Sequence, residues 1–123
     1  ALAVTLLGAR QAPLIDPEPI DVPAGMSVDK VASVIEWATR KRQWWVDKQE
    51  PGRMVVVQLV QGHRAKVAIV YDAKTVKLQY VSSQNLGFEA RPDGSRVIHP
   101  RYIAWVNNLR SDILRDLNAP PEE

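Results

Sequence analysis

The chain contains no cysteine, which excludes disulfides, thiolate catalysis and metal sites built on cysteine. It also carries no large charge of one sign, because 16 Lys and Arg against 14 Asp and Glu give a net charge of +2. That charge is too small to argue for polyanion binding by the chain as a whole. These absences exclude classes of site, but they identify neither a compartment nor a reaction.

No hydrophobic run is long enough to cross a bilayer, since the apolar residues 1–9 fall well short of the roughly 20 that a membrane helix needs. A segment containing Pro13, Pro17, Pro19 and Pro23 follows. An apolar stretch followed by a proline-rich stretch is typical of the end of a secretory signal and an extended linker. Residues 6–9 also resemble the approach to a bacterial lipoprotein cleavage site. Arg10 stands where the lipidated cysteine would be, which excludes lipidation there. Either ordinary cleavage occurs further along the chain, or the gene departs from the lipoprotein pattern. The remaining alternative is a floppy N-terminus or a first strand in a cytosolic protein.

The length of 123 residues fits one domain, and 46% hydrophobic with 24% charged residues is typical of a soluble globular protein. We predict a signal remnant and proline-rich linker over residues 1–25. A single α+β domain follows over residues 26–118, and a disordered tail over residues 119–123.

Residues 54–82 contain consecutive runs in which apolar and polar side chains alternate, which is the pattern of half-buried β-strands. We expect each run to turn its apolar residues to one face of a sheet. These residues are Val55, Val57 and Leu59 in the first run, Ala65, Val67, Ile69 and Tyr71 in the second, and Val76, Leu78 and Tyr80 in the third.

The loops between the runs fix a register. Pairing Leu59 with Val67 leaves a loop of residues 62–64, and pairing Tyr71 with Val76 leaves a loop of residues 72–75. A fourth strand opens at Trp44-Trp45 and turns at Pro51-Gly52, where we expect a longer loop or a bulge. One of the two tryptophans should then face the core, and the other is a candidate contact residue on the far face or at the edge.

Two amphipathic helices flank the strands. Ser27 is a good N-cap for the first, which ends in the cations Arg40 to Arg42, and Pro100 suits the first turn of the second. Residues 82–97 between the sheet and the second helix read as a loop, with Leu86 and Phe88 as anchors. The buried stripes are Val28, Val31, Ala32, Ile35 and Ala38 in the first helix, and Tyr102, Val106, Leu109, Ile113 and Leu117 in the second.

The sequence therefore predicts an α+β two-layer sandwich. A four-stranded antiparallel meander has both helices packed on one face, in the order α-β-β-β-β-α. The other face is expected to mix apolar and polar residues, namely Val56, Val60, Ala68 and Val70 among Gln58, Lys66, Lys77 and Gln79. Such a face suits a partner or a homodimer, unless the linker covers it with Leu14, Ile15 and Ile20.

Several motifs carry a resemblance. They are residues 62–65 with the alternating run after them, residues 80–83 with Asn85-Leu86, and Ile98-His99 followed by Tyr102, Trp105-Val106 and Asn108-Leu109. Over residues 26–115 the chain resembles a family of small uncharacterised bacterial envelope proteins, many of them predicted lipoproteins. The resemblance implies a periplasmic or envelope-surface location after signal cleavage, and it adds no chemistry.

No catalytic, cofactor or metal site is predicted. His63 and His99 lack the spacing of a metal pair, and a histidine base would need an orienting acceptor and a pocket. His99 fits a cap at the start of the second helix. The carboxylates available to a catalytic histidine are Asp47, Asp72, Glu89 and Asp93.

We therefore predict a non-enzymatic envelope module that binds an envelope protein or cell-wall component, that is, a protein, glycan or lipid partner. The candidate contact residues are Trp45, His63, Arg64, Lys66, Lys77 and His99. The alternative is a small envelope hydrolase that uses His99 with a nearby carboxylate. A nucleic-acid binder using a basic sheet face is a third hypothesis, which an envelope location disfavours.

Overall fold

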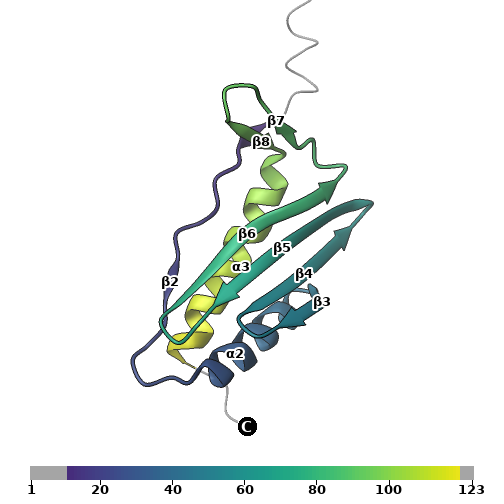
Figure 1. The fold of residues 1–123 in the computed structure, drawn as a ribbon. Coiled ribbons are helices and arrows are strands. Elements are labelled where there is room, and N and C mark those ends of the chain that lie inside the picture. Colours follow the sequence, from purple (N-terminus) through teal and green to yellow (C-terminus); the bar gives the residue numbers. More distant parts are fainter. Residues whose placement is uncertain (1–10, 120–123) are drawn as a thin grey trace, which may run out of the picture.

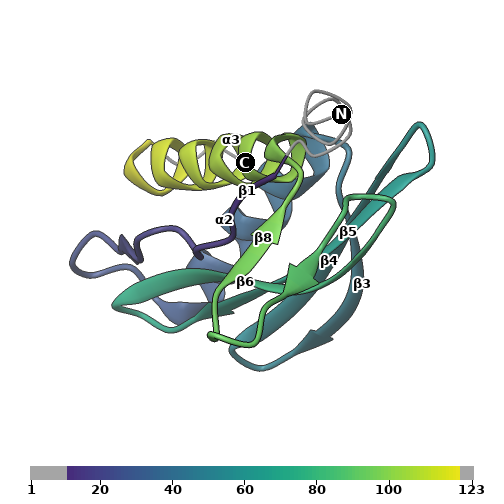
Figure 2. The same ribbon diagram turned by 90° about the horizontal axis from the view of Figure 1, so that it is seen from above.

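The computed structural model describes residues 11–119. An antiparallel five-stranded sheet forms one layer, and both helices pack on one side of it (Figure 1, Figure 2). The predicted α+β class with an antiparallel sheet is confirmed. The predicted four-stranded meander is only roughly matched, because a short N-terminal strand joins it. The predicted signal remnant with Arg10, and the tail from residue 120, lie outside the described residues.

The sheet has the order β2-β6-β5-β4-β3. The strands are β2 (Ile20–Asp21), β3 (Trp45–Glu50), β4 (Arg53–Val60), β5 (His63–Tyr71) and β6 (Thr75–Gln84). Between β5 and β6, Tyr71 pairs with Val76 as predicted. The Asp72 carboxylate closes this turn by accepting the N–H groups of Lys74 at 2.7 Å and Thr75 at 2.8 Å.

The predicted register between β4 and β5 is wrong. Leu59 pairs with Arg64 rather than Val67, and only Gln61 and Gly62 remain in the turn. Both have positive φ, 51° and 81°, as a type I′ turn requires. A glutamine is an unusual residue for such a turn, so the sequence favoured a longer loop. Because successive side chains of a strand point to opposite faces, this change of register exchanges the residues on the two faces of β4.

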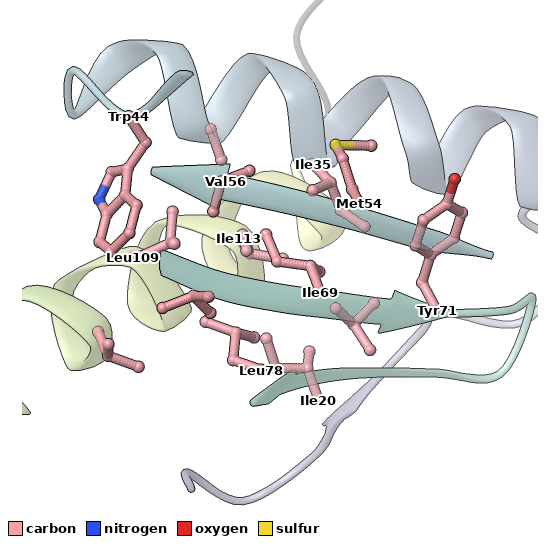
Figure 3. Packing of buried hydrophobic residues seen from close by; sticks show 14 of the residues in the cluster. Ile20, Ile35, Trp44, Met54, Val56, Ile69, Tyr71, Leu78, Leu109 and Ile113 are labelled. Atoms are coloured by element: carbon pink, nitrogen blue, oxygen red, sulfur yellow. The ribbon is translucent and has the colours of Figure 1, made fainter. Parts of the chain in front are cut away.

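The reversal of β4 changes which of its residues are in the core. Met54 and Val56 lie in the core cluster, and Val55, Val57 and Leu59 point to the other side of the sheet. Figure 3 shows Met54 and Val56 beside Ile69 of β5 on the helical side. The predicted composition of the far face is therefore corrected in β4. Val56, Gln58 and Val60 leave it, and Arg53, Val55, Val57 and Leu59 take their places.

The turn between β3 and β4 contains only Pro51 and Gly52, so the longer loop is absent. The expected bulge is present further back, where the register shifts at Asp47. Gly52 has φ +79°, and its carbonyl accepts the N–H of Tyr71 at 2.9 Å. Trp44 is 2% exposed and Trp45 is 44% exposed. The prediction that only one of the two tryptophans lies in the core is thus confirmed.

Helix α2 (Val28–Lys41) begins as predicted, with the Ser27 side chain accepting the Lys30 N–H at 3.1 Å. Val31, Ile35 and Ala38 of its predicted stripe are buried, whereas Val28 is exposed. Helix α3 (Pro100–Asn118) buries the whole predicted stripe against α2 and the sheet. Trp105 is partly buried at the edge of this stripe.

The segment predicted as a loop contributes two strands to a second, small sheet in the order β1-β8-β7, and the third strand comes from the N-terminal segment. Its strands are β1 (Ala12–Pro13), β7 (Glu89–Ala90) and β8 (Arg96–Ile98). Of the predicted anchors, Leu86 is buried and Phe88 is 40% exposed. Residues 11–25, predicted as a linker, run along the β6 edge beside the helices (Figure 1, Figure 2). Leu14 and Ile20 from this segment enter the core.

Candidate functional site

The side of the sheet that points away from α2 and α3 is called the outer face, and Figure 1 looks onto it. Its members alternate with the core residues and pair across the strands. They are Trp45, Lys48 and Glu50 of β3; Arg53, Val55, Val57 and Leu59 of β4; Arg64, Lys66, Ala68 and Val70 of β5; and Lys77, Gln79, Ser82 and Gln84 of β6. Among residues 11–119, neither a helix nor the predicted linker covers this face.

The centre of the outer face is apolar and closely packed. Val57 is 0%, Ala68 1% and Val55 6% exposed. Trp45 and Lys66 are the cross-strand neighbours of Val57, and their long side chains shield it from water. Trp45 at 44% and Leu59 at 56% expose much of their own apolar surface. The face therefore combines a filled centre with exposed apolar side chains.

Cations outnumber carboxylates on the outer face. Lys66 Nζ lies 3.5 Å from Asp47 Oδ2 at the β3 bulge, and a guanidinium nitrogen of Arg53 lies 3.8 Å from Glu50 Oε1. Within the described part of the chain, no ion pair is found for the other cations of the face, which are Lys48, Arg64 and Lys77. The face consequently attracts anions, although the chain as a whole is almost neutral.

The structure brings together four of the six predicted contact residues, namely Trp45, Arg64, Lys66 and Lys77, on the outer face. It adds Leu59, Arg53 and Lys48, which the sequence reasoning missed. Leu59 and Arg53 depend on the two-residue turn at Gln61-Gly62, which sets the faces of β4 and for which Gln61 gives no sequence signal.

His63 has a local structural role at the β4–β5 hairpin. Its Nδ1 lies 2.6 Å from the Asn85 carbonyl oxygen, and the Asn85 amide donates to the Gly62 carbonyl at 2.8 Å. Asn85 has φ +60°, a conformation that asparagine tolerates better than most residues. The hairpin is thereby tied to the end of β6.

His99 lies in the helical layer, at the start of α3. Its Nδ1 accepts the Arg101 N–H at 2.9 Å, which confirms the predicted cap. An open hollow of about 660 Å³ is lined by residues of the connection from β2 to α2 and of the β5–β6 turn. Figure 1 shows both segments at the opposite end of the molecule from the start of α3. The lining of the hollow includes Asp21, Ser27 and Lys74, and neither histidine.

The motifs that carry the resemblance meet at the end of the sheet where α3 begins. The His99 N–H donates to the Leu86 carbonyl at 2.8 Å, and the Tyr80 hydroxyl lies 2.8 Å from the Ser83 hydroxyl. The Tyr80 ring stacks on Phe88 at 4.7 Å and meets Tyr102 edge-on at 5.5 Å. Burial raises the pKa of Tyr102 well above its usual value. The residues of these motifs therefore pack against one another where β6 ends and α3 begins.

Two of the proposed catalytic carboxylates instead stabilise turns. Hydrogen bonds from the backbone of Thr75 and Lys74 lower the pKa of Asp72, and bonds from Ser95 lower that of Asp93. A general acid working near neutral pH needs a raised pKa, so both residues are poorly suited to that role.

A cluster of ion pairs between the helices was missed by the sequence analysis. Arg42 Nε donates to Asp112 Oδ2 at 2.6 Å, and Lys41 Nζ lies 2.7 Å from Asp116 Oδ2. Asp112 is only 3% exposed, and the bond from Arg42 is the main cause that lowers its pKa. The cluster could have been inferred from the spacing of Asp112 and Asp116, which are one helical turn apart and precede Ile113 and Leu117 of the buried stripe. The cluster joins the end of α2 to α3.

The Gln58 side chain links this cluster to the sheet. Its amide nitrogen donates to the Arg42 carbonyl oxygen at 2.8 Å. Gln58 lies on the helical side of β4 and is only 8% exposed, and this hydrogen bond gives its buried amide nitrogen a partner. The cluster thus holds α2, α3 and β4 together, so its charged groups have a structural role.

Across residues 11–119, no three His, Asp or Glu side chains gather in a way that could hold a metal ion. Neither α2 nor α3 is long and apolar enough to cross a membrane. Comparison of the chain with protein-family models, curated proteins and solved structures gave no match.

Proposed function

We propose that this chain is a non-enzymatic module of the bacterial cell envelope, periplasmic or lipoprotein-like, that binds a partner through the outer face. The observation that carries the proposal is the outer face itself. It presents Trp45, Leu59 and unpaired cations, and no described element covers it. The envelope location rests on the N-terminal pattern and on the resemblance of the motifs.

The geometry favours binding over the alternative of a small hydrolase that uses His99. The Nδ1 of His99 accepts a backbone N–H in the helix cap, so this nitrogen cannot donate the hydrogen bond by which a carboxylate orients a catalytic histidine. The hollow of about 660 Å³ is lined by other residues. By contrast, Lys48, Arg64 and Lys77 of the outer face form no ion pair within residues 11–119 and are available to a partner.

The test is chemical cross-linking in intact bacterial cells that express the whole gene, followed by separation of periplasmic, membrane and cytosolic fractions. Arg64→Glu and Lys77→Glu reverse charges on the outer face. Arg101→Glu makes the same charge change at an exposed position in the helical layer, and serves as the matched control. Melting temperatures of all three variants establish that they fold.

We expect one set of cross-linked envelope components that is lost in both outer-face variants and retained in Arg101→Glu. Cross-links that persist in the outer-face variants would exclude this face as the binding surface. Recovery of the protein from the cytosol alone would overturn the envelope location.

A further inference from the structure

The exposed apolar side chains of the sheet gather at one end of the outer face. Trp45, Val57 and Lys66 are cross-strand neighbours on three adjacent strands. Leu59 lies two residues beyond Val57 on β4, directly opposite Arg64 of β5. Val81, 40% exposed, lies in the β6 bulge beside Ser82, the partner of Lys66 on the other side. One tryptophan and two aliphatic side chains are therefore interleaved with Arg64 and Lys66.

The remaining cations extend away from this end over the rest of the face. Arg53 and Lys77 both pair with Val70, which follows Arg64 by six residues of β5. At about 3.3 Å per residue, the cations extend over roughly 20 Å of the outer face. With Lys48 and Lys66 included, and Asp47 and Glu50 subtracted, the face has a net charge of about +3.

We infer that the outer face binds the anionic surface of a phospholipid bilayer, with Trp45, Leu59 and Val81 at the headgroup boundary and the cations against the phosphates. This inference rests on the proposed binding role of the face and names its partner. Tryptophan sits favourably at the boundary between headgroups and hydrocarbon. Lysine and arginine beside it gain from the negative surface potential.

Charge and packing argue against other occupants. A second copy docked face to face would bring another net charge of about +3 against the first, which is repulsive. A protein partner would gain most by inserting an anchor side chain into a pocket, but the centre of the face is already filled by Val55, Val57 and Ala68. Single-stranded nucleic acid stacks on several aromatic rings, and the outer face offers Trp45 alone. A planar lipid surface needs neither a pocket nor a fixed register.

The test is co-sedimentation of the full chain with vesicles of phosphatidylcholine, with and without phosphatidylglycerol. We expect binding that requires phosphatidylglycerol and weakens as salt is raised. Arg64→Gln and Lys77→Gln should each weaken binding about fivefold, since one cation near such a surface contributes about 1 kcal/mol. Leu59→Gln should weaken it without a change of charge, and Arg101→Gln should leave it unchanged. Every variant keeps residues 1–9, so any contribution from that apolar stretch cancels.

Vesicle binding that is absent, or that is equal in the outer-face variants and Arg101→Gln, would overturn the lipid assignment. So would self-association of the free protein, or binding of a single-stranded oligonucleotide, that depends on the same residues. The cross-linking experiment separates this failure from failure of the proposed function. If cross-links to an envelope protein still depend on Arg64 and Lys77 while vesicles are not bound, the module stands and its partner is a protein.

Discussion

At the scale of single residues, the neighbours Trp44 and Trp45 have opposite environments. Trp44→Ala should lower the free energy of unfolding by about 3 to 5 kcal/mol, because its ring is fully buried in the core. Trp45→Ala should lower it by less than about 1 kcal/mol, because its ring lies half exposed on the outer face. Urea unfolding of the two variants measures the difference. Equal losses would contradict the placement of β3.

Asp112 provides a pH-dependent prediction at the same scale. Its folded pKa lies below the ordinary value, so the folded state binds fewer protons there than the unfolded chain does. The stability it contributes is therefore complete above about pH 5 and is lost as pH falls through the lowered folded pKa. At pH 7, Asp112→Asn should cost about 1 to 2 kcal/mol, a modest loss because Arg42 is half exposed.

Urea unfolding between neutral pH and pH 3 tests this prediction. The difference between the natural chain and Asp112→Asn should shrink as pH falls, since the variant cannot titrate at this position. In the double variant Arg42→Gln with Asp112→Asn, the second substitution should cost much less than it does alone. A difference that stays constant with pH would show that Asp112 stabilises the fold by packing rather than by its charge.

At the scale of elements, both helices could be predicted from sequence, because the caps at Ser27 and His99 and the periodic stripes are local signals. The β5–β6 hairpin was predictable for the same reason, as Asp72 is a residue that closes such a turn. The β4–β5 register was not, since Gln61 gave no sign of its positive φ. That single error placed Leu59 on the core side of the sheet and concealed part of the outer face.

The β4–β5 turn itself yields the next prediction. Gln61 holds φ 51°, a left-handed conformation that costs most residues about 1 kcal/mol and that asparagine adopts more readily. Gln61→Asn should therefore raise the free energy of unfolding by about 0.5 kcal/mol. Gln79→Asn in β6 is the matched control. It should lower stability slightly, because asparagine is disfavoured in strands. A loss of stability in Gln61→Asn would argue for the longer loop predicted from sequence.

At the scale of the whole molecule, the N-terminal segment decides how far the folded unit extends. Its prolines indicated a linker, because proline is rare inside regular structure. Contacts distant in sequence instead hold it in place: the Leu14 N–H donates to the Arg96 carbonyl at 2.8 Å, and the Asp16 carboxylate accepts the Tyr80 N–H at 3.0 Å. Single-sequence patterns carry no information about such partners. The position of this segment at the β6 edge is also what leaves the outer face open.

Leu14 and Ile20 are therefore expected to behave as core residues although both lie in a proline-rich segment. They are 4% and 1% exposed, whereas Ile15 beside them is 76% exposed. Leu14→Ala and Ile20→Ala should each lower the free energy of unfolding by about 2 to 5 kcal/mol, because each leaves a cavity in the hydrophobic core. Ile15→Ala, the matched control, should change it by less than about 0.5 kcal/mol. Urea unfolding of the three variants measures the contrast. Equally small effects would mean that the segment detaches in solution, in which case it could reach the outer face and compete with a partner there.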